Sequence, residues 1–153
     1  MKRYAWLGVF AAALLTVAMA SKPKVADNQA AANKALVMDM VQMLFVDHKV
    51  DEAVAKYFDP NYIQHNPYAA TGAAAMGAFF KQYYQTTPTA TVKLDHVICE
   101  ANLCAVHYNS ISKPGDRGSA VVDIFRIEGG KIAEHWDVVQ TVPEKSANNN
   151  TMF

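Results

Sequence analysis

The chain has 153 residues, of which 52% are hydrophobic and 18% are charged, and its 14 basic residues equal its 14 acidic ones in number. This length suits a single domain that can bury a substantial core. A near-neutral chain without a basic stripe argues against nucleic acid or an anionic membrane surface as its partner.

The first 20 residues have the order of a secretory signal peptide. Lys2 and Arg3 precede an apolar run, and small residues end the segment at 18–20. The apolar run is short for a membrane span, and the residue after the expected cleavage point, Ser21, is not a cysteine that could accept a lipid. We expect cleavage after Ala20 and export to the periplasm or the medium, with no membrane contact afterwards.

The next part of the chain predicts helices. Residues 28–46 carry apolar side chains at three- and four-residue spacings, which is typical of a helix with one buried face. A shorter helix at 51–57 would be capped by Asp51 and would end before Pro60, because the residue before a proline avoids helical dihedrals. Further expected elements are an extended segment at 61–65 and an Ala-rich helix at 73–86.

Strands dominate the rest of the chain, at 91–99, 104–112, 120–127 and 131–142. Helices followed by a run of antiparallel strands predict an α+β domain whose sheet curls around the helices. We place this domain at 21–143 and a polar, weakly patterned tail at 144–153.

The last two strands meet at Gly129-Gly130 and predict a β-hairpin with two alternative registers. A loop of the two glycines alone would place Asp123 opposite Trp136. A three-residue loop, 128–130, with a bulge at its end would place Asp123 opposite His135.

We prefer the bulged register because it separates polar from apolar side chains, since residues alternate between the two faces of a sheet. One face, suited to a wet cavity, then carries Asp123, Phe125, His135, Asp137 and Val139. The other, suited to burial, carries Val122, Ile124, Ile132, Trp136 and Val138. A homodimer packing through this second face would cover it.

Cys99 and Cys104 lie opposite each other if residues 101–102 form the turn of another hairpin. A disulfide is then sterically possible, and two buried free thiols are the alternative. The same register places His96 opposite His107. Two imidazoles alone make a poor zinc site, because zinc normally takes three or four protein ligands, so we expect no metal here.

Several local motifs resemble the SnoaL-like polyketide cyclases of the NTF2-like superfamily. The matching segments are Tyr62-Ile63-Gln64-His65-Asn66-Pro67, Asp123-Ile124-Phe125-Arg126, Gly130-Lys131-Ile132-Ala133-Glu134-His135-Trp136-Asp137 and Asn150-Thr151-Met152-Phe153. The resemblance implies a cone-shaped α+β barrel in which a strongly curved antiparallel sheet wraps around N-terminal helices. It also implies proton transfer beside a carbonyl without a cofactor.

Within that resemblance, Asp137 corresponds to the acid/base aspartate of the cyclases. Asp123 replaces a histidine of the cyclases, and a carboxylate there donates a hydrogen bond only when it is protonated. The related ketosteroid isomerases have their general base at the position of Asn66 and their oxyanion-binding tyrosine near Gln42. Asn66 cannot take up a proton as a general base, and Gln42 is not a tyrosine, so steroid isomerisation is not expected.

The residue chemistry agrees with an acid/base site. Proton abstraction beside a carbonyl needs a base near the carbon and donors where negative charge develops. Two carboxylates near one imidazole, if buried, would separate each other's proton affinities. The expected catalytic residues are Asp137 as base, with His135, Asp123 and His65; the expected substrate-binding residues are Asn66, His107, Tyr108, Phe79, Tyr83 and Phe125.

The function we expect is therefore that of a lyase, isomerase or cyclase acting on a small hydrophobic carbonyl compound. A non-catalytic protein that binds a small hydrophobic ligand is the alternative, because one fold serves many functions. A weaker third reading is an interaction domain that uses the Trp136 face.

Overall fold

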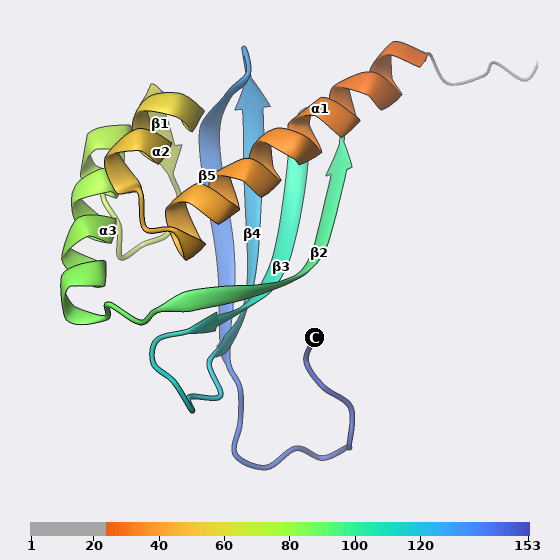
Figure 1. The fold of residues 1–153 in the computed structure, drawn as a ribbon. Coiled ribbons are helices and arrows are strands. Elements are labelled where there is room, and N and C mark those ends of the chain that lie inside the picture. The colour runs from red at the N-terminus through yellow and green to blue at the C-terminus, as the bar shows by residue number, and fades with distance from the viewer. Residues whose placement is uncertain (1–23) are drawn as a thin grey trace, which may run out of the picture.

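A computed structural model describes residues 24–153, so the expected signal peptide at 1–20 lies outside the described residues. The elements follow the order expected from the sequence (Figure 1). They are α1 (Lys24–Val41), a π-helical turn η1 (Gln42–Val46), α2 (Val50–Tyr57), β1 (Phe58–Gln64), α3 (Ala73–Thr86), β2 (Thr91–Glu100), β3 (Leu103–Ile111), β4 (Ser119–Glu128) and β5 (Lys131–Thr141).

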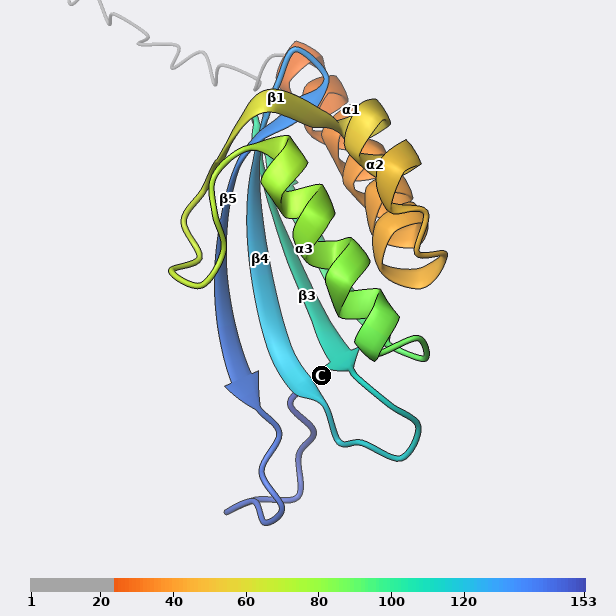
Figure 2. The same ribbon diagram turned by 90° about the vertical axis from the view of Figure 1, so that its left-hand side faces the viewer.

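The five strands form one strongly curved open sheet in the order β1-β5-β4-β3-β2. The edge strand β1 runs parallel to β5, and the other neighbours are antiparallel. Figure 2 shows the three helices on one side of this sheet, inside its curve. The α+β class and the sheet wrapped around helices are thereby confirmed.

Two local predictions about helix ends and strand starts were inexact. Asp51 is not the cap of α2; Lys49 is the N-cap residue, without a side-chain hydrogen bond, and Asp51 lies in the first turn, where the helix dipole favours a negative charge. β1 begins at Phe58 and contains Pro60, which an edge strand tolerates because its outer N–H groups need no partner.

The predicted hairpin register was wrong at the turn, but the predicted assignment of polar side chains to the inner face was right. The loop is Gly129-Gly130 alone, with both glycines at positive φ and Ile127 opposite Ile132. The register then shifts at Ala133, the extra residue of a bulge in β5, so that Asp123 pairs with Asp137.

The bulge restores the predicted faces because one extra residue exchanges the faces beyond it. Asp123, Phe125, His135 and Asp137 therefore share the inner side. Ile132 precedes the bulge, lies in the core at 0% exposure and does not belong to the outer stripe. The rest of that stripe, which we call the outer face, is Val122, Ile124, Trp136 and Val138.

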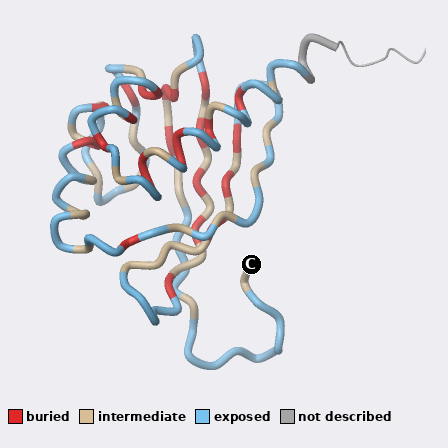
Figure 3. The backbone as a smooth tube through the Cα atoms, in the orientation of Figure 1, coloured by how far each residue is buried: buried red, intermediate tan, exposed pale blue. Residues whose placement is uncertain are grey.

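The core lies between the helices and the inner side of the sheet, and its largest fully buried side chains are Tyr62, Met40, Leu44, Ile132 and Val37. Figure 3 shows buried residues concentrated where the helices cover the strands, while the C-terminal segment is exposed. Among the described residues, no helix is both long and apolar enough to cross a membrane.

Cys99 and Cys104 are paired across β2 and β3 and form a disulfide, which decides between the two alternatives. His96 lies opposite His107, as predicted. The tail after Pro143 has no helix or strand, and the ring of Phe153 stacks on His107 at 5.6 Å between centroids.

Candidate active site

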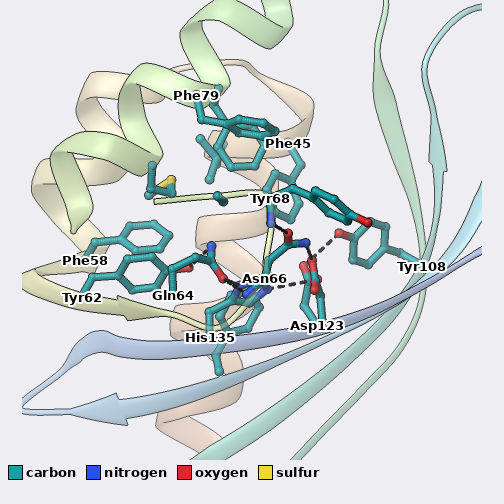
Figure 4. Close-up of a pocket in the computed structure, with 16 residues that line it drawn as sticks. Phe45, Phe58, Tyr62, Gln64, Asn66, Tyr68, Phe79, Tyr108, Asp123 and His135 are labelled. Atoms are coloured by element: carbon teal, nitrogen blue, oxygen red, sulfur yellow. Dashed lines mark hydrogen bonds and ion pairs between the residues drawn. The ribbon is translucent and has the colours of Figure 1, made fainter. Parts of the chain in front are cut away.

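A cavity of about 200 Å³ opens between α3, η1 and the inner side of the sheet. Aromatic and aliphatic side chains form most of its wall, and the polar groups come from β1, β3, β4, β5 and the loop after β1 (Figure 4). The lining residues are Leu44, Phe45, Phe58, Tyr62, Gln64, Asn66, Tyr68, Ala69, Met76, Phe79, Phe80, Tyr108, Asp123, Phe125, His135 and Asp137.

Two ionisable side chains at the floor of the cavity are almost fully buried, Asp123 at 3% and His135 at 7% exposure. Tyr108 on β3 donates its hydroxyl hydrogen to Asp123 Oδ2 at 2.8 Å. His135 Nε2 lies 3.2 Å from Asp123 Oδ1. Both carboxylate oxygens therefore have partners, as burial of a charged group requires.

The side-chain amide of Gln64 fixes the tautomer of His135. The backbone N–H of Asn66 donates to Gln64 Oε1 at 2.9 Å, and because a backbone N–H can only donate, its partner is the amide oxygen. The same oxygen lies 2.8 Å from His135 Nδ1, so Nδ1 carries a proton. The contact between His135 Nε2 and Asp123 then needs one further proton, held by one of these two groups.

Asp137 is held in a similar way by the side chain of Asn66. The backbone N–H of Tyr68 donates to Asn66 Oδ1 at 2.8 Å, which makes the other terminal atom the amide nitrogen. That nitrogen donates to Asp137 Oδ2 at 2.6 Å. Asn66 thus supports Asp137 as an acceptor, and Asp137 does not pair with Arg126 or Lys131, which contact other groups.

The cavity environment also acts on two tyrosines. Burial, with the negative charge of Asp123 adding to it, raises the pKa of Tyr108 well above its usual value. The pKa of Tyr62 is raised chiefly by burial and further by the charges of Asp123 and Asp137. Both hydroxyls therefore remain protonated donors at neutral pH.

The carboxylates and the imidazole could be considered as metal ligands, because one ligand atom from each of Asp123, His135 and Asp137 lies within 4.8 Å of the others. The hydrogen bonds of these side chains favour proton transfer over metal binding. His135 Nδ1 donates to Gln64, and its Nε2 already lies 3.2 Å from Asp123 Oδ1. An arrangement that orders protons on these atoms suits proton transfer better than ion binding.

A shallower groove of about 350 Å³ continues outward from the cavity and shares Phe79, Phe80, Tyr108 and Asp137 with it. Its remaining wall is richer in hydroxyl groups and comprises Tyr83, Ser110, Ser112, Asp116, Gly118, Ser119, Val121, Val139 and Thr141. Asp137 thus stands where the apolar cavity meets the polar groove.

Most of the residues predicted for the site lie there. Asp137, His135, Asp123, Asn66, Tyr108, Phe79 and Phe125 line the cavity, and Tyr83 lines the groove.

The predictions for His65 and His107 as site residues are corrected by their positions. His65 Nε2 contacts Glu134 Oε1 at 2.7 Å, and its ring stacks on Trp136 at 4.7 Å, outside the cavity. His107 alternates with the inward Tyr108 and therefore points to the opposite side of β3, where it meets Asp95.

Sequence reasoning missed the residues that orient the two key groups. Gln64 lies in the expected extended segment and in one of the matching segments, but the sequence predicted no role for it, although it holds His135. The sequence did not predict that Phe58 and Tyr62 line the cavity, and the predicted extended segment begins only after Pro60, whereas β1 begins at Phe58. Alternation places Tyr62 and Gln64 on a single face, whereas an irregularity in the pairing of β1 with β5 separates them from Phe58.

A family model for the SnoaL-like domain matches residues 37–135, and the chain belongs to this family. A comparison with curated proteins finds no match.

Solved structures share the fold. TsrD from Streptomyces laurentii is 21% identical, with 71% of this chain and 88% of that chain covered and a TM-score of 0.60. A provisionally assigned ketosteroid isomerase from Kribbella flavida is 16% identical, with 82% and 90% covered and a TM-score of 0.65. A provisionally assigned polyketide cyclase from Acidithiobacillus ferrooxidans is 14% identical, with 71% and 87% covered and a TM-score of 0.60.

Proposed function

We propose that the protein is a cofactor-independent acid/base enzyme that abstracts a proton beside the carbonyl of a small hydrophobic compound. One observation carries this proposal: Asp137, held as an acceptor by Asn66, borders an apolar cavity next to a buried pair in which His135 Nε2 lies 3.2 Å from Asp123 Oδ1. A base and a proton donor thereby face one space.

The reaction follows from these positions. The C–H bond beside the carbonyl breaks and its proton goes to Asp137, while the electron pair moves toward the carbonyl oxygen. The pair of His135 and Asp123 gives up its proton to that oxygen as the negative charge develops, so that an enol forms in place of a free enolate. Isomerisation results when Asp137 returns its proton to another carbon and the pair takes back the proton on the oxygen. Cyclisation results when the enol carbon attacks a second carbonyl, whose oxygen takes the proton from Asp137 while the pair takes back its own.

The size of the cavity limits the substrate. A volume of about 200 Å³ is below the range of roughly 300–1,000 Å³ usual for ligand pockets. We infer that the cavity takes the apolar part of a compact ketone, and that a larger substrate extends into the hydroxyl-lined groove beyond Asp137.

The test uses 2-tetralone, a compact bicyclic ketone, in deuterated water. NMR would follow deuterium uptake at the carbon beside the carbonyl, with enzyme and buffer rates compared. Asp137→Asn should lower the enzymatic rate by about 10²- to 10⁴-fold, the usual contribution of a general base. Glu134→Gln, a matched carboxylate outside the cavity, should keep the rate. Equal rates for wild type and Asp137→Asn would refute the proposed base.

The apolar wall of the cavity supports a second candidate, a carrier of a small hydrophobic molecule without chemistry. Phe45, Phe58, Phe80 and Phe125 offer aromatic surface that needs no catalytic group. Native mass spectrometry distinguishes the two: a ligand that stays bound and unchanged, with no deuterium uptake in any ketone tried, favours the carrier.

We further propose export to the periplasm or the medium. The leader-like order at 1–20 and the Cys99–Cys104 disulfide support it, since disulfides persist in oxidising compartments. Fractionation of cells that express the full chain tests it, because a protein recovered only from the cytoplasm at full length would contradict export.

A further inference from the structure

A second group of ionisable side chains lies on the side of the β2–β3 hairpin away from the cavity. It consists of Asp95 and His96 on β2 and His107 on β3, and one ligand atom from each lies within 4.8 Å of the others. We propose that these three residues form a binding site for a divalent transition-metal ion of the Zn²⁺ or Cu²⁺ type. This inference is independent of the proposed enzymatic function.

A β-bulge brings the three side chains together. Leu94 pairs with Tyr108 and His96 pairs with His107, so Asp95 is the extra residue between them. In a regular strand, neighbouring residues point to opposite faces, but a bulge re-aims one of them. Asp95 thereby joins the two histidines and supplies the third ligand that the paired imidazoles lack.

The contacts within the group converge on one point. Asp95 Oδ2 lies 3.4 Å from His107 Nδ1 and is also in direct contact with His96 Nδ1. Zinc bonds of about 2.0–2.1 Å place tetrahedral ligand atoms about 3.3 Å apart. A small rotation of the side chains would therefore let an ion take the place of the direct contacts between the carboxylate and the rings.

Two neighbouring features hold the group in place. The Cys99–Cys104 disulfide joins the same two strands three residues from each histidine, so the pairing that aligns the rings is covalently clamped. The ring of Phe153 stacks on His107 and restricts its rotation. Ligands that are ordered before binding lose less entropy when the ion arrives.

The kinds of donor atom indicate the kind of ion. Two imidazole nitrogens and one carboxylate oxygen suit zinc, copper or nickel, whereas calcium and magnesium prefer oxygen ligands. Three protein ligands leave at least one position for water or for a group from another molecule. The side chain of His96 is 66% exposed, so an ion has direct access from solvent.

The test measures Zn²⁺ binding by competition with a chromogenic chelator, using protein that carries no polyhistidine tag. Wild type should bind one equivalent. His107→Ala and Asp95→Asn should each weaken binding by at least 10- to 100-fold, since loss of a ligand costs no less than loss of a group that only supports one. Glu100→Gln, an exposed carboxylate on the same hairpin, should leave the affinity unchanged.

The cavity cluster is the competing location, so Asp137→Asn is measured in parallel and should bind Zn²⁺ like wild type. Loss of binding in Asp137→Asn, full binding in His107→Ala, or no binding by wild type would each overturn the proposal. Electron paramagnetic resonance of the Cu²⁺-loaded wild type needs no variant that must fold. Two coupled imidazole nitrogens are expected there, and fewer than two would contradict the site.

Discussion

The two sides of the β4–β5 hairpin carry the same kinds of ionisable side chain in opposite surroundings. On the inner side, Asp123 and His135 are buried together, with His135 Nε2 3.2 Å from Asp123 Oδ1. On the outer side, Glu134 contacts both His65 and Arg126 at 2.7 Å in a partly exposed network. A histidine beside a carboxylate therefore does not identify a catalytic site; the environment of the pair decides its use.

The difference is also visible in the direction of pKa shifts. Outside, the hydrogen bond from Arg126 lowers the pKa of Glu134, with His65 adding to it, so this carboxylate simply stays charged. Inside, burial raises the pKa of Tyr108 and Tyr62 and keeps both as donors beside the carboxylates. Burial is thus what turns ordinary side chains into groups that can hold and move a proton.

The largest expected effect on stability comes from breaking the inner pair. Asp123→Ala leaves His135 and Tyr108 buried without their partner and should lower the free energy of unfolding by about 3 kcal/mol, as breaking a buried pair does. Glu134→Ala, its outer counterpart, should change stability only slightly, because solvent replaces the lost contacts. Urea unfolding followed by circular dichroism measures the stability of both variants. Equal decreases in the free energy of unfolding would contradict the proposed difference between the inner and the outer pair.

A smaller effect on the free energy of unfolding should appear at alkaline pH. The pKa of Tyr108 is raised by folding, so its stabilising contribution is complete below the unfolded value of about 10 and declines as pH rises above it. The decline should be about 1.4 kcal/mol per pH unit for each such tyrosine. Tyr108→Phe should show a shallower decline between pH 10 and 12 in urea unfolding; an unchanged slope would mean that this hydroxyl is not shielded.

A substitution in the outer face is expected to change the oligomeric state and to leave the activity of the cavity unchanged. Val138 is 69% exposed and stands beside Trp136, Val122 and Ile124, so we propose that a second copy packs on this surface. Light scattering should report a dimer for wild type and a monomer for Val138→Lys, with deuterium exchange retained in the variant. A wild-type monomer at micromolar concentration would contradict the dimer.

Much of the fold followed from the sequence because alternation and helical periodicity are local signals. They predicted the four long strands, the helix at 73–86 and the shared face of Asp123, His135 and Asp137. The two bulges could not be predicted, since Ala133 and Asp95 have no side-chain property that marks an extra residue. The positions of the bulges depend on how whole strands pair with each other, and a short stretch of sequence does not determine that pairing.

The same limit explains the errors in the candidate site. His65 was expected in the cavity, but it lies directly after the end of β1, with its ring on the outer side against Trp136. Gln64, the adjacent residue, points inward and orients His135. Which of two neighbours enters a cavity depends on the register of an edge strand.

The most direct test is ¹⁵N–¹H NMR of the histidine side chains of wild type and Gln64→Leu near neutral pH. The account predicts that His135 carries a proton on Nδ1 in wild type, hydrogen-bonded to Gln64, and that a slowly exchanging proton lies between its Nε2 and Asp123. In Gln64→Leu the preference for Nδ1 should weaken. An unprotonated Nδ1 in the wild type would contradict the proton arrangement on which the proposed chemistry depends.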